Sequence, residues 1–104
     1  MPFMTEPTFY YKTALSDLQG AWQVLRDAVV EHPPFTEQSR LLIHIDEGMS
    51  WENVRDLRNM EKILLVIRNI VAQATVDPVL REQSDLVYGA LYEVFEALAE
   101  GEDR

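Results

Sequence analysis

The side chains that could carry chemistry in this sequence are two histidines and a surplus of carboxylates. His32 follows Glu31, and His44 stands between two isoleucines. Neither has the HExxH or ExxH spacing that places metal ligands on one face of a helix. Glu93 and Glu96 are spaced as neighbours on a helix and could form an acid and base pair. They fall on the most polar helix face, which favours a solvated charge surface over a catalytic pair. From the histidine spacing we expect no metal site.

The residues needed for covalent and redox chemistry are missing or in the wrong setting. The chain has no cysteine, which removes thiolate nucleophiles, disulfides and thiolate metal ligands. Its four serines stand in no nucleophile motif, and no glycine-rich loop could cradle a phosphate. We therefore expect a protein that is not an enzyme, with no catalytic residue and no cofactor.

The charge is strongly acidic and unevenly distributed. Asp and Glu number 18 against 9 Lys and Arg, and the formal net charge is -9. Residues 77–104 hold eight of the acids and two of the bases, so this end would repel phosphates and we expect no direct nucleic-acid binding. The main basic cluster, Arg55, Arg58, Lys62 and Arg68, alternates with acids at helical spacing. That pattern is typical of intrahelical ion pairs on a solvated face.

Length and hydropathy favour one domain away from the membrane. At 104 residues the chain can bury one core but not two. Its longest apolar run is five residues, 63–67, whereas a membrane span needs about 20. The first residues have neither the basic region nor the apolar stretch of a signal peptide, which predicts a cytoplasmic protein without a membrane partner.

The spacing of apolar residues predicts an all-α fold, a small antiparallel bundle of about four helices over residues 9–101. Residues 1–8 hold two prolines and no periodicity, so we expect an extended arm there. The first helix should span 9–31, because Pro33 and Pro34 end it. Thr36 should cap a second helix to about residue 47, with Gly48 as a left-handed terminator. Alternation over 41–45 leaves a short strand open as the alternative.

Two further helices follow from capping signals. Ser50 is a good N-cap for the third helix, and Met49 and Val54 have the spacing of a hydrophobic staple. Asp77 and Pro78 form a cap and first turn for the fourth helix, which should end near Gly101. The seam of the third helix comprises Leu57, Met60, Leu64, Ile67, Val71 and Ala74, and that of the fourth comprises Leu80, Val87, Leu91, Val94 and Leu98.

The fourth helix has more apolar surface than its place in such a bundle requires. Its apolar arc is about twice the width that one-sided packing needs, and the third helix shows a milder excess. Uncovered patches of this size usually meet a partner, which predicts a homodimer or a docking surface for another protein. The alternative is that the second helix and the N-terminal arm cover the excess. The candidate interface residues are Leu65, Ile70, Leu86, Tyr88, Ala90, Tyr92 and Phe95.

In size, acidity and helix layout over residues 9–100, the chain resembles the small all-helical anti-activators of bacterial quorum sensing. The likeness lies in overall character, with Leu57, Leu64, Ile67, Leu91 and Val94 as apolar stripes, and in no diagnostic motif. Proteins of that kind bind transcription factors of the LuxR type and prevent DNA binding. The resemblance implies inhibition through protein contact and carries over no individual functional residue.

Three functions fit these observations. The first is a non-catalytic regulatory protein that binds a protein partner, such as a transcription factor, through apolar helix faces and inhibits it. The second is an acidic helical chaperone or assembly subunit. The third is an acidic nucleic-acid mimic, whose binding would weaken steeply with salt and resist loss of apolar residues, whereas the first two functions predict the opposite.

Overall fold

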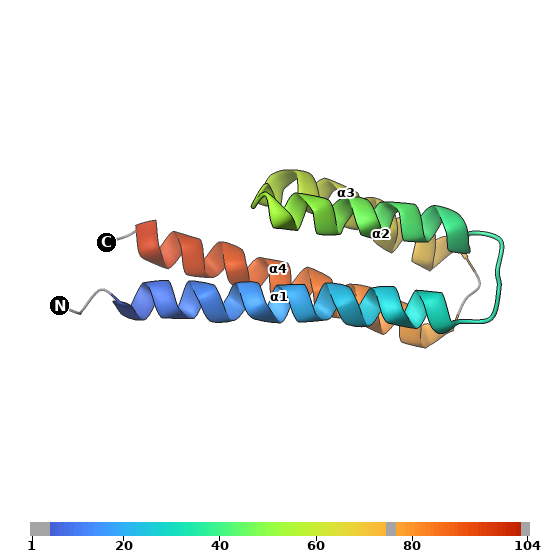
Figure 1. The fold of residues 1–104 in the computed structure, drawn as a ribbon, viewed down its shortest axis with the longest axis horizontal. Coiled ribbons are helices and arrows are strands. Elements are labelled where there is room, and N and C mark those ends of the chain that lie inside the picture. The colour runs from blue at the N-terminus through green and yellow to red at the C-terminus, as the bar shows by residue number, and fades with distance from the viewer. Residues whose placement is uncertain (1–4, 75–76, 103–104) are drawn as a thin grey trace.

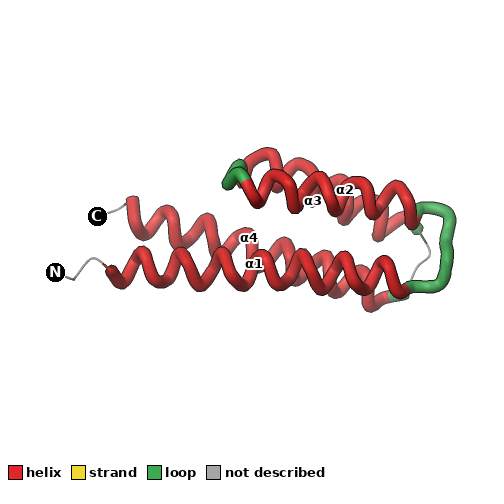
Figure 2. The backbone as a smooth tube through the Cα atoms, in the orientation of Figure 1, coloured by secondary structure: helices red, strands yellow, loops and turns green. Residues whose placement is uncertain are grey.

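The computed structural model describes residues 5–74 and 77–102, and over these residues the chain forms helices and connecting turns (Figure 2). The helices are α1 (Thr5–Glu31), α2 (Gln38–Asn53), α3 (Leu57–Gln73) and α4 (Pro78–Glu102). Successive helices run in opposite directions along one axis (Figure 1). The described residues contain no strand, so the predicted all-α bundle is confirmed, and the segment 41–45 is helical.

Each helix packs against two others. Helix α1 contacts α2 and α4, and α3 contacts the same two. The helices of the α1–α4 pair have 27 and 25 residues, whereas α2 and α3 have 16 and 17. At a rise of about 1.5 Å per residue, the longer helices exceed the shorter ones by roughly 12–17 Å. Figure 1 shows this excess projecting past the α2–α3 turn, at the end where both termini lie.

Helix α1 begins earlier than its sequence pattern predicts. Residues 5–8, expected in the extended arm, are helical, and residues 1–4 lie outside the described part. Pro7 is compatible with this start, because the first four amide groups of a helix have no intrahelical acceptor in any case. The end of α1 at Glu31 agrees with the sequence. There Gln38 Nε2 donates to the carbonyls of Val29 at 2.8 Å and His32 at 3.1 Å.

Gly48 does not terminate α2, contrary to the prediction. It is a buried residue inside the helix without a positive φ, and the helix continues to Asn53. A Cβ atom at this position would lie 2.5 Å from Cη2 of Trp22. Glycine is therefore required here by the close approach of the Trp22 ring and not by backbone conformation.

The α2–α3 turn also differs from the expected capping pattern. Ser50, Met49 and Val54 do not form a cap and staple, because Ser50 and Met49 lie within α2. The N-cap of α3 is Asp56, whose carboxylate accepts a hydrogen bond from the backbone amide of Asn59 at 3.2 Å. Arg55 adopts a φ of 60°, the left-handed conformation that reverses the chain in place of a glycine.

The start of α4 is as predicted. Pro78 is the first helical residue, and the Asp77 carboxylate accepts a hydrogen bond from the Val79 amide at 3.0 Å. At the other end the helix passes through Gly101 to Glu102, one residue beyond the expected stop.

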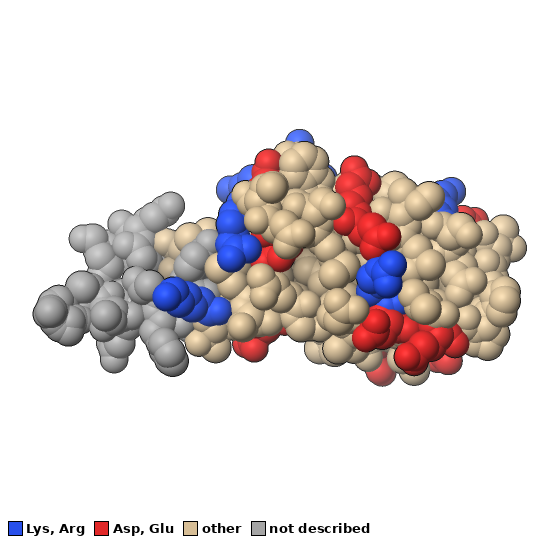
Figure 3. Space-filling model, viewed as in Figure 1, with Lys and Arg blue, Asp and Glu red and all other residues tan. Residues whose placement is uncertain are grey.

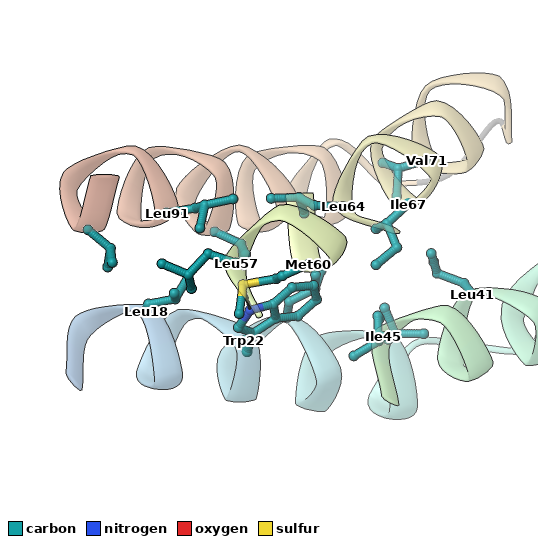
Figure 4. Close-up of a cluster of buried hydrophobic side chains, with 14 of the residues drawn as sticks. Leu18, Trp22, Leu41, Ile45, Leu57, Met60, Leu64, Ile67, Val71 and Leu91 are labelled. Carbon is teal, nitrogen blue, oxygen red and sulfur yellow. Dashed lines mark hydrogen bonds between the residues drawn. The ribbon is translucent and has the colours of Figure 1, made fainter. Parts of the chain in front are cut away.

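The core follows the predicted seams of the third and fourth helices, although Ala74 and Leu98 are only partly buried, and residues of α1 and α2 complete it. Trp22 lies at its centre and donates a hydrogen bond from Nε1 to the sulfur of Met60 at 3.4 Å (Figure 4). Beside it, the nearly buried Glu52 accepts hydrogen bonds from Gln19 and Arg55 at 2.9 and 3.0 Å. These contacts join α1 to α3 and to the end of α2, beside the α2–α3 turn.

Candidate protein-docking face

The predicted interface residues do not form one surface. Tyr88, Tyr92 and Phe95 lie together along α4 on the side that faces α3. Leu65 is 50% exposed on α3. Leu86, 60% exposed, lies about 200° around α4 from Tyr88 at 100° per residue, with Ala90 on the same far flank.

Ile70 is a correction to the predicted interface. Its side chain is 3% exposed and belongs to the core, so it is not available to a partner. It lies at the edge of the α3 seam, beside Glu37 and Arg40 near the start of α2. The packing of α2 against α3 covers it, which the helical pattern of α3 alone does not reveal.

The three α4 aromatics form a strip of edge-to-face contacts. The ring centroids of Tyr88 and Tyr92 are 4.8 Å apart, and those of Tyr92 and Phe95 are 6.0 Å apart. The hydroxyl oxygens of Tyr88 and Tyr92 are 3.1 Å apart and share one hydrogen bond. Spacings of four and three residues place these rings one above another on the helix, and edge-to-face packing holds them in fixed orientations.

Two arginines of α3 lie over the ends of this strip. The guanidinium carbon of Arg68 is 4.2 Å from the Tyr88 ring centroid, and that of Arg58 is 5.4 Å from the Phe95 ring centroid. Arg68 also forms an ion pair with Asp85 at 2.9 Å. We define the α3–α4 face by the residues Arg58, Leu65, Arg68, Tyr88, Tyr92 and Phe95.

Sequence reasoning missed the role of these arginines. It interpreted the basic cluster as intrahelical ion pairs, but the partner of Arg68 is on another helix and Arg58 contacts an aromatic ring. Only Arg55, which pairs with Glu52 three residues earlier, follows the local pattern. The register between two helices decides such contacts, and a single helix pattern does not contain it.

The α3–α4 face ends in a groove beneath the α2–α3 turn. The groove holds about 800 Å³, and it is lined by Leu57 and Arg58 on one side and by Tyr92, Phe95 and Leu98 on the other. It exists because α4 continues past the last residues of α2 and the first of α3 (Figure 1). On the side of the molecule drawn in Figure 3, basic side chains gather at this same end of α2 and α3.

Tyr92 is the residue of this face with a perturbed acidity. The hydrogen bond with Tyr88 raises the pKa of Tyr92, and electrostatic repulsion from Tyr88, desolvation and the charge of Glu61 act in the same direction. The neutral hydroxyl, which can donate and accept hydrogen bonds, is therefore the form present over the physiological range.

The residues considered for catalysis or metal binding lie apart. His44 contacts Glu47 at 3.4 Å, and His32 packs edge-on against Phe35. No group of three potential metal ligands occurs within residues 5–74 and 77–102. Over the same residues, no helix has the length and apolar character to cross a membrane.

Comparison with known proteins adds no identification. No protein-family model, no curated protein and no solved structure matches this chain. The apolar stripes behind the resemblance to quorum-sensing anti-activators are core residues in this fold, at most 7% exposed. A partner therefore has to be met by other residues than these.

Proposed function

We propose that this protein is a non-catalytic regulator that binds a protein partner through the α3–α4 face and inhibits it. The observation that carries the proposal is the aromatic strip of α4, whose rings contact one another edge to face beside exposed Leu65 and two arginines. Tyr92 is exposed, and Tyr88 and Phe95 are partly buried against the core beneath it. Tyrosine and arginine are the residue types that dominate the binding energy of protein interfaces.

The shape and charge of the face favour a protein as the ligand. The rings form a strip along a helix, and the groove at its end is open to solvent, whereas small-molecule sites bury most of their ligand. The net charge of -9 opposes binding to phosphates. An apolar centre with charged edges is the usual arrangement of a protein docking surface.

The first partner class to test is a transcription factor. The sequence resembles anti-activators that act on such proteins, and a small helical protein can inhibit by occupying an apolar surface that its partner needs for assembly or DNA binding. The same surface would serve a chaperone or assembly subunit, so the identity of the captured partner separates these two functions.

The experiment is affinity capture from native extract of the source cells, at low and high salt, with wild-type protein and two variants. Tyr92→Ala removes an exposed ring from the face, and Ile43→Ala removes an even more exposed apolar side chain from α2. We expect a stoichiometric partner that resists salt, is lost with Tyr92→Ala and is kept with Ile43→Ala. Circular dichroism should show both variants folded.

The second stage tests inhibition directly. A captured transcription factor should lose DNA binding on addition of the wild-type protein in equal amount, and keep it on addition of Tyr92→Ala. Capture of secreted or assembling proteins instead would support the chaperone. Capture of nucleic-acid-binding proteins that dissociate at high salt and bind Tyr92→Ala as they bind wild type would contradict the proposal. That result would favour the nucleic-acid mimic.

A further inference from the structure

Unpaired charges of opposite sign occur on the two helices that form the α3–α4 face. Arg58 and Lys62 are exposed on α3, and Glu93 and Glu96 are exposed on α4. None of the four has an ion-pair partner among the described residues, in contrast to Arg68, which pairs with Asp85.

Around α4, Glu96 lies about 40° from Tyr92, whereas Glu93 shares the far flank of Leu86. On α3, Glu61 lies beside Arg58 near Tyr92. Arg58 and Glu96 are therefore the unpaired charges of opposite sign that border the aromatic strip.

The register of the two helices places these charges at matching heights. Arg58 lies over Phe95, Glu61 acts on Tyr92, and Arg68 contacts Asp85. These contacts fix an antiparallel register in which Arg58 is level with residue 95 of α4, and Lys62 is level with residue 91. Glu96, one residue further along α4, is then close to the level of Arg58.

We propose that a second copy of this chain docks on the α3–α4 face, related by a two-fold axis parallel to the helices. This inference rests on the proposed function in that it takes the same face to bind protein, and it names the chain itself as an occupant. In this dimer, α3 of each copy lies over α4 of the other. Arg58 then meets Glu96 of the second copy, and the aromatic strips pack between the two equivalent contacts.

Charge decides this orientation over the other two-fold arrangement. A two-fold axis across the helices would place α3 on α3, so that Arg58 and Lys62 would face basic side chains of the second copy. An axis along the helices keeps the height of each residue and exchanges the two helices, which puts base against acid twice. An isologous interface requires this kind of self-complementarity. Exposed Leu65 and Tyr92 then fill its centre, and the charges form its rim.

The dimer also makes self-association and partner binding compete. Both use Tyr92 and Phe95, so a foreign partner has to separate the two copies before it binds. The apparent affinity for that partner should then fall as the concentration of the chain rises.

The test is sedimentation velocity on the purified full chain over a wide concentration range. Wild type should dimerise, and Arg58→Glu and Glu96→Arg should each weaken the dimer about tenfold, because each places like charges against each other. An equal mixture of the two variants should dimerise as wild type does. In the mixed dimer, both contacts again join a base to an acid.

Matched controls carry the same charge changes on α1. Lys12→Glu and Glu31→Arg are exposed positions away from the α3–α4 face and should leave the dimer unchanged. The proposal would be overturned if the wild type stayed monomeric, or if neither Arg58→Glu nor Glu96→Arg weakened the dimer. Weakened single variants without recovery in the mixture would overturn the parallel arrangement. A monomeric chain that still captures a partner through Tyr92 would leave the proposed function standing.

Discussion

Gly48 shows how the absence of one methyl group positions the largest core side chain. The Trp22 ring lies directly over its backbone, and the indole nitrogen then reaches the sulfur of Met60. We expect Gly48→Ala to lower the free energy of unfolding by about 1–2 kcal/mol, because the clash with the ring exceeds the gain in helix propensity. Urea unfolding followed by circular dichroism measures this change.

Gly20 provides the matched control. It also lies within a helix, but nothing stands within 4 Å of an added Cβ atom. Gly20→Ala should therefore raise the free energy of unfolding by about 0.5–1 kcal/mol. Equal effects of the two substitutions would show that Trp22 does not pack on Gly48.

The hydroxyl pair of Tyr88 and Tyr92 gives a second prediction at a single residue. The hydrogen bond raises the pKa of Tyr92 above its ordinary value of 10.0. Since the folded pKa is the higher one, this preference stabilises the fold below that pH and is lost as the pH rises through the folded pKa. Tyr88→Phe should lower the pKa of Tyr92, as read from an NMR titration of labelled tyrosines. A titration unchanged by Tyr88→Phe would rule out the hydroxyl pair.

The helix starts give a prediction for whole elements. Asp56 and Asp77 accept backbone hydrogen bonds at the starts of α3 and α4, so Asp56→Ala and Asp77→Ala should each cost about 1 kcal/mol of unfolding free energy. Ser50→Ala should have little effect or stabilise slightly, because Ser50 is an exposed residue within α2. A large loss of unfolding free energy on Ser50→Ala would instead show that Ser50 caps a helix, as its sequence position suggests.

These helix ends also show what a single sequence can predict about the fold. Asp77 and Pro78 predict the start of α4 from local chemistry, and the structure confirms this start. The core seams follow from helical spacing alone. Gly48 and Ser50 carry equally strong local signals, yet α2 runs through both. Packing of Trp22 against Gly48 and the buried hydrogen bonds of Glu52 favour a longer helix, and those contacts join residues 26 and 33 positions apart.

The candidate site was predictable to a similar extent. Tyr88, Tyr92 and Phe95 share a helix face by spacing, so their grouping needed no tertiary information. The arginines over them come from α3, and the burial of Ile70 comes from α2, so both depend on how helices meet. Helical periodicity describes one helix at a time. It therefore predicts the grouping of the α4 aromatics but not the arginines of α3 that lie over them.

At the scale of the whole molecule, the charge is unbalanced although individual ion pairs are satisfied. The formal net charge is -9, while the described ion pairs, such as Arg26 with Asp46 at 2.8 Å, involve partly or largely exposed groups apart from the buried Glu52. Exposed pairs contribute about 0–1 kcal/mol each, whereas the net repulsion acts on every acidic group. Repulsion among the acids therefore outweighs the local pairs at low salt.

Screening by salt should accordingly stabilise the fold. The Debye length falls from about 30 Å at 0.01 M to about 8 Å at 0.15 M ionic strength, which is shorter than the 20 Å width of the molecule. We expect the Tm to rise by several degrees between these conditions, in melts followed by circular dichroism at a concentration where sedimentation shows one species. The increase should be smaller near pH 4.5, where the net charge approaches zero. A Tm that falls with salt would mean that the exposed pairs, and not the excess of acid, dominate the electrostatic free energy of this bundle.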